Sequence, residues 1–158
     1  MTTRELPSIA SIIGSVLQRV AASHRPLFIA LAERLAAERY RRWAKDASGP
    51  ARRDLLACAA REDAIADRVA ALYPDAEALQ TRLRADHPEI DEVNESIFAG
   101  RSLEQQFAIQ AAGERAGAAA WRSFAAETGD AAARETFLAC AGLEEESAAY
   151  LESVLAGG

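Results

Sequence analysis

Apolar residues recur every three to four positions along most of the chain, the spacing typical of amphipathic helices. Proline, glycine and serine interrupt this pattern between the periodic segments. The stretch 73–101 is acidic and irregular, apart from a short helix over 75–85. The sequence therefore predicts an all-α fold in a single domain, 1–158. The expected helices are an N-terminal helix over 7–22 and four longer ones over 26–47, 50–72, 102–127 and 130–155.

The connections between the long helices predict how they are arranged. A helix of roughly 22 residues is about 33 Å long. The two short connections each favour an antiparallel hairpin, whereas the stretch 73–101 is long enough to return along the whole helix length. We therefore expect a four-helix bundle with one long crossover between its hairpins.

The N-terminal helix is an addition to this bundle, and its apolar stripe has to be buried. We expect it to lie against the outer face of helix 26–47 or against a second chain. The stripe consists of Ile9, Ile12, Ile13, Val16, Leu17 and Val20.

The two hairpins are near repeats of each other. The first contains ALAERLAAERYRRWA at 30–44, which aligns with AAGERAGAAAWRSFA at 111–125. The next helix of each hairpin contains LLACAARED at 55–63, which aligns with FLACAGLEE at 137–145. One glutamate occupies the equivalent position on the apolar stripe of each long helix, which points to a site in the middle of the bundle. These residues are Glu33, Glu62, Glu114 and Glu144.

Four inward carboxylates need compensation, because an unpaired buried carboxylate costs several kcal/mol or takes up a proton. No lysine or arginine lies on the four predicted inward faces. The remaining ways to compensate these carboxylates are protonation, trapped water or a bound cation. Two divalent metal ions held by the four glutamates would nearly neutralise them. The alternative of four surface glutamates does not explain their place on the apolar stripes.

With this pattern, the sequence resembles the ferritin-like superfamily over 26–155, in particular the rubrerythrin-type di-iron carboxylate proteins. That family places a glutamate on each of two helices and a Glu-x-x-His motif on each of the other two. Glu33 and Glu114 match the first kind of position, and Glu62 and Glu144 match the glutamates of the second. The resemblance implies these four residues as the metal ligands.

The two motif histidines of the family are missing, since Ile65 and Ser147 occupy their positions. His24 and His87 are predicted to lie elsewhere as solvated residues and cannot substitute. The loss of two imidazoles implies an all-oxygen site, which suits iron or manganese and also tolerates Mg²⁺ or Ca²⁺. The activity of the family is therefore not carried over intact, and the sequence leaves open whether the protein is an enzyme.

Four further residues near the site are interpreted as core. Cys58 and Cys140 lie one turn before the motif glutamates, on opposite sides of the site, which predicts small buried thiols with thiolate ligation as the alternative. Tyr40 and Trp121 lie two turns beyond Glu33 and Glu114 and are predicted to fill the ends of the bundle rather than to relay electrons.

Charge and composition narrow the function classes. The formal net charge of −6 argues against a nucleic-acid partner, which favours a basic face. No apolar run approaches the roughly 18 residues of a membrane span. The apolar segment 9–17 lacks a strongly basic start, so we interpret it as part of a mature helix in a cytoplasmic protein. Glycine-rich phosphate loops and zinc-type cysteine spacings are missing from the sequence.

Together these features predict a ferritin-like protein with an atypical all-carboxylate site for iron or manganese. Its role would be weak oxidase or peroxidase chemistry or the handling of metal ions. The alternative is a non-enzymatic structural or interaction protein whose site is metal-free. Because ferritin-like proteins commonly assemble, we expect a homodimer or a higher homo-oligomer.

Overall fold

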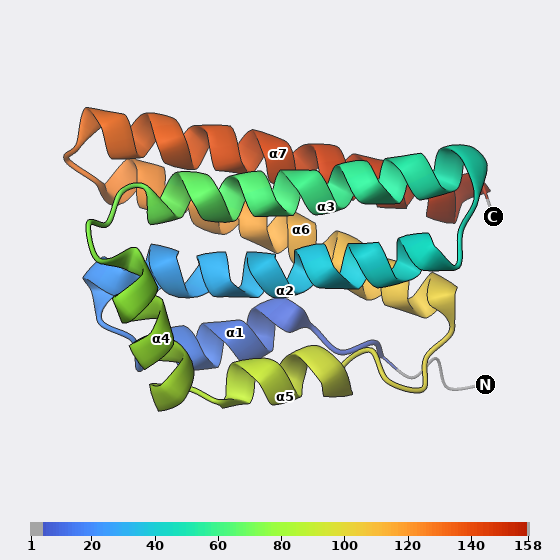
Figure 1. The fold of residues 1–158 in the computed structure, drawn as a ribbon, viewed down its shortest axis with the longest axis horizontal. Helices are drawn as coiled ribbons and strands as arrows, with labels where there is room; N and C mark the ends of the chain where they lie inside the picture. The colour runs from blue at the N-terminus through green and yellow to red at the C-terminus, as the bar shows by residue number, and fades with distance from the viewer. Residues whose placement is uncertain (1–4, 158) are drawn as a thin grey trace.

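The computed structural model describes residues 5–157, which are all-helical as the sequence predicts and contain no strand. Four long helices lie side by side and form a bundle (Figure 1). Their ends fall close to the predicted positions. The four helices are α2 (Arg25–Lys45), α3 (Gly49–Ala70), α6 (Leu103–Glu127) and α7 (Ala131–Gly157).

The long helices form two antiparallel hairpins, α2 with α3 and α6 with α7 (Figure 1). The connection between the hairpins returns from one end of the bundle to the other and contains α4 (Ala76–Asp86) and α5 (Glu89–Ser96). The prediction of irregular chain after residue 85 is therefore wrong. Three acidic residues occupy the first turn of α5, where negative charge stabilises a helix through its dipole.

Side-chain caps fix the start of each helix in the second hairpin. Ser102 and Gln105 form a capping box at the start of α6. Asp130 accepts hydrogen bonds from the backbone N–H groups of Ala132 and Ala133 at the start of α7. These caps satisfy backbone N–H groups that the first turn of each helix leaves without a partner.

The N-terminal helix α1 (Ile9–Leu17) is shorter than the predicted 7–22. Arg25 explains where the chain turns, because its Nε donates to the carbonyl oxygens of Leu17 and Val20. The apolar stripe of α1 packs against α2, α4, α5 and α6 of the same chain. Val16 and Val20 are buried there, whereas Ile9, Ile12, Ile13 and Leu17 are half-buried, and the homodimer stays a prediction.

The bundle interior has an apolar cluster at each end and a polar layer between them. Most residues of the predicted inward faces are buried, whereas Leu72, Gly117 and Phe124 are half-buried and Val154 near the end of α7 is exposed. Cys58 and Cys140 are free, buried and in opposite clusters, as predicted. One apolar cluster includes Tyr40, Trp43, Leu55, Phe107 and Leu151, and the other includes Ile29, Ile65, Val69, Trp121 and Phe137.

None of the helices between residues 5 and 157 is long and apolar enough to cross a membrane.

Two leucines on α7 test this packing. Leu151 is fully buried, whereas Leu138 is 49% exposed. We expect Leu151→Ala to lower the free energy of unfolding by about 2–5 kcal/mol, because it leaves a cavity in the core. Leu138→Ala changes it by less than about 0.5 kcal/mol. Urea denaturation measures both, and equal effects would contradict the inward face assigned to α7.

Candidate metal centre

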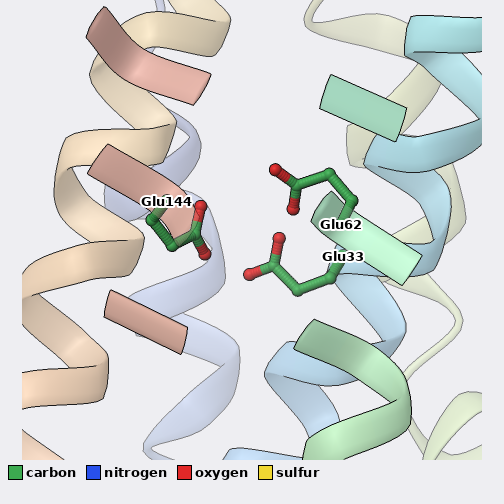
Figure 2. A group of neighbouring side chains, drawn as sticks. All are labelled: Glu33, Glu62 and Glu144. Carbon is green, nitrogen blue, oxygen red and sulfur yellow. The ribbon is translucent and has the colours of Figure 1, made fainter. Parts of the chain in front are cut away.

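Three of the predicted glutamates converge in the polar layer. Glu33 on α2, Glu62 on α3 and Glu144 on α7 point toward one another across the bundle (Figure 2). Each offers a carboxylate oxygen within 4.8 Å of the oxygens of the other two. Their exposed fractions are 8%, 0% and 1%. Three helices from both hairpins thus bring three carboxylates to one buried point.

The fourth predicted residue, Glu114 on α6, is also buried but lies outside this converging group. Its Oε1 accepts hydrogen bonds from the Tyr40 hydroxyl at 2.6 Å and from Gln110 Nε2 at 2.8 Å. Its Oε2 has no hydrogen-bond partner in the part of the chain that the structure describes. Glu114 is therefore held beside the group with one oxygen free.

The position of Glu144 depends on two residues of α6. Trp121 Nε1 donates a hydrogen bond of 3.0 Å to Glu144 Oε1. Gly117 leaves the space that the carboxylate fills, because a Cβ atom there would lie 2.5 Å from the same oxygen. Any larger residue at position 117 would displace the Glu144 carboxylate.

The interpretation of Tyr40 and Trp121 as bundle-end core is therefore incomplete. Both are fully buried, but each also donates a hydrogen bond to a glutamate of the site. A signal was present in the sequence, because the hairpin repeat aligns these two residues and both carry a donor. A buried tyrosine or tryptophan normally places its polar atom against a partner.

Glu62 is the least compensated of the four carboxylates. It is fully buried, and neither of its oxygens has a hydrogen-bond partner among residues 5–157. Its counterpart in the repeat, Glu144, receives the Trp121 indole hydrogen bond, whereas Tyr40 donates across the bundle to Glu114. Tyr40, the donor that the repeat would place against Glu62, thus donates to Glu114 instead.

Burial and mutual repulsion disfavour the charged form of these carboxylates. Burial raises the pKa of Glu62 well above its ordinary value, and the charges of Glu114, Glu144 and Glu33 raise it further. Burial followed by the charge of Glu33 also raises the pKa of Glu144. Burial raises the pKa of Glu33 too, although a proton on the neighbouring Glu62 or Glu144 carboxyl, shared with Glu33, opposes this rise. Without a cation, the group therefore tends to retain protons.

Arg39 is a buried cation that the pattern of apolar residues does not reveal. It is only 5% exposed, and its guanidinium carbon lies 3.9 Å from the centre of the Phe98 ring. Its Nη1 donates to Gln110 Oε1, and Gln110 in turn donates to Glu114. Burial lowers the pKa of Arg39 to about 10, so it remains charged at neutral pH. One cation cannot balance four carboxylates.

The positions of the missing histidines hold no metal ligand. Ile65 is fully buried. Ser147 is buried as well, and its hydroxyl accepts a hydrogen bond of 2.9 Å from Arg61 Nε. The prediction that His87 is solvated is wrong, because it packs edge-on against Phe28 with ring centres 5.8 Å apart. His24 is half-buried at the start of α2.

The two thiols are poorly suited to be ligands in this state. Burial raises the pKa of the Cys140 thiol to about 12. It also raises the pKa of Cys58, whose sulfur accepts a hydrogen bond from Arg61. Because a thiol must lose its proton to bind a metal, both remain core residues, as predicted.

Comparisons of the chain with protein-family models, with curated proteins and with solved structures found no match. The chemistry of the site is therefore argued from its own geometry. A buried group of carboxylate oxygens, several without donors, fits a hard cation such as Mn²⁺, Mg²⁺ or oxidised iron. The residues present thus suit an ion bound through oxygen alone.

The raised pKa values predict how stability depends on pH in metal-free protein. The folded state keeps protons on Glu62 and Glu144 that the unfolded chain releases above about pH 4.5. The free energy of unfolding should therefore fall as pH rises from there through the raised pKa values. Glu62→Gln should reduce this slope and stabilise the fold at neutral pH.

Urea denaturation with a chelator present, repeated at several pH values, measures this dependence. Glu146→Gln on α7 is the matched control, because it removes the same charge from an exposed position. The control should keep the wild-type slope. Identical slopes for wild type and Glu62→Gln would show that the buried carboxylates do not determine the pH dependence.

Proposed function

We propose that the protein binds iron or manganese at the centre of a ferritin-like bundle. Glu33, Glu62 and Glu144 are the proposed ligands, and Glu114, the fourth residue expected as a ligand, lies beside them. The observation that carries the proposal is Glu62, which is fully buried, has no donor for either oxygen within residues 5–157, and faces two further carboxylates. A cation compensates all of these oxygens at once.

The arrangement of the helices supports the ferritin-like part of this proposal. The two hairpins, the crossover that returns along the bundle and the glutamates near mid-helix all agree with it. Metal-free carboxyls that share protons are the competing explanation. That state requires several protons to be kept at neutral pH, whereas a bound cation replaces most of them.

The residues around the site orient the carboxylates and separate them from water. A bound iron or manganese ion supplies Lewis acidity and the capacity for electron transfer. Trp121 orients Glu144, and Tyr40 and Gln110 orient Glu114. Apolar clusters on both sides exclude water, which strengthens the electrostatic attraction between the carboxylates and a cation.

Metal content tests the proposal. Protein purified without chelator from medium supplemented with iron and manganese should contain stoichiometric iron or manganese by elemental analysis. Glu62→Ala should lose the metal, because it removes the ligand with no other partner. Glu146→Gln should retain it. Wild-type protein without stoichiometric metal would refute the proposal and favour the structural, metal-free alternative.

The space at Gly117 gives a second test. Gly117→Ala should weaken metal binding by about 10–100-fold, because the new methyl group displaces the Glu144 carboxylate. Gly142→Ala on α7 meets no atom within 4 Å and is the matched control. It should leave the affinity unchanged and stabilise the helix by about 0.8–1 kcal/mol. Competition with a chelator of known affinity measures both, and equal affinities would argue against Glu144 as a ligand.

A further inference from the structure

A mostly apolar cavity of about 160 Å³ lies beneath α1 and extends to the carboxylates. Its walls come from α1, α2, α6 and the α5 region and include Ile13, Val16, Phe28 and Ile29. Small residues on the facing helices leave the space open: Ala32 and Ala36 on α2, and Ala116 on α6. Glu33, Glu114 and Glu144 also line the cavity.

Two buried polar atoms of residues that line this cavity lack partners in the described part of the chain. One is Arg39 Nε, a hydrogen-bond donor, and the other is Glu114 Oε2, an acceptor. Arg39 is 5% exposed and Glu114 is 1% exposed. Buried polar groups are nearly always paired with protein, water or a ligand. A donor and an acceptor beside an apolar space therefore indicate what an occupant must carry.

We propose that this cavity binds a small, mostly apolar molecule with one hydroxyl group, of about the size of phenol. An apolar cavity of about 150 Å³ holds benzene, so the volume suits one six-membered ring. A hydroxyl group both accepts and donates, which matches Arg39 Nε and Glu114 Oε2. Carboxylates repel an anion, and the mostly apolar walls disfavour any charged group, so the ligand is neutral.

Arg39 also provides a route into the cavity. Leu35, Arg39, Asn94 and Phe98 line both the cavity and a larger open groove outside it. Arg39 lies over the Phe98 ring at this boundary. The Arg39 side chain therefore lies where the groove and the cavity meet, and a ligand that comes from the groove passes this side chain.

The site adjoins the proposed metal centre but does not depend on it. Calorimetric titration measures the binding of phenol, cyclohexanol and benzene. It is done with the protein as purified and again after chelator treatment. We expect saturable binding in both states, with the two hydroxyl compounds at least about tenfold tighter than benzene, because hydrogen bonds to charged groups give that difference. Phenol binding that disappears with the metal would place phenol on the metal and overturn the proposal.

Four variants locate the ligand. Ala36→Leu fills the cavity and should abolish binding of all three compounds, and Ala32→Leu is a second filling variant at a less buried position. Ala112→Leu adds the same side chain at an exposed position of α6 and should bind as wild type does. Arg39→Met removes the donor but keeps an apolar chain, so benzene should still bind and the preference for phenol should fall.

These outcomes separate the proposal from its alternatives. No binding of any compound to wild-type protein would show that water alone occupies the cavity. Equal binding to Ala32→Leu and wild type would place the ligand elsewhere, and so would an unchanged phenol preference in Arg39→Met. Either result would overturn the proposal and leave the metal content, measured separately, unaffected.

Discussion

Repulsion among buried carboxylates is the constraint around which the bundle interior is organised. Glu33, Glu62 and Glu144 converge at one point with almost no exposure to water, where charges interact more strongly than at the surface. Each neighbouring polar group lowers the free-energy cost of placing these charges together in the core. Trp121 donates to one glutamate, Tyr40 and Gln110 donate to Glu114, and Arg39 places a cation behind Gln110. These contacts leave Glu62 uncompensated, which is the basis for proposing a cation.

The repeated hairpin explains both the site and its asymmetry. Equivalent positions supply a glutamate on every long helix and an aromatic donor on α2 and α6. The two donors have different kinds of partner, since Trp121 donates to Glu144 in its own hairpin and Tyr40 donates to Glu114 in the other hairpin. The α1 helix adds a further difference, because it covers α2 and α6 and encloses a cavity on that side of the carboxylates. The carboxylates and an apolar space thus lie next to each other.

The all-helical fold and the inward place of the glutamates were predictable from sequence, because both follow from the spacing of apolar residues. The helix at Glu89–Ser96 was missed, since its acidic first turn resembled an irregular stretch. Arg39 was missed because a charged residue beside the stripe is normally solvated, and its burial depends on Phe98 from the distant crossover. The roles of Tyr40 and Gly117 depend on distances between helices, which the pattern along one helix does not contain. Which carboxylates converge is likewise a property of packing, and it separates Glu114 from the other three.

The central claim is that a metal ion compensates the converging carboxylates. Anomalous diffraction from crystals grown with Mn²⁺, with data collected on both sides of the manganese absorption edge, tests it most directly. The account predicts an anomalous peak among the carboxylate oxygens of Glu33, Glu62 and Glu144. Crystals in which manganese is found only at the surface, while these three carboxyls are hydrogen-bonded to one another, would contradict it.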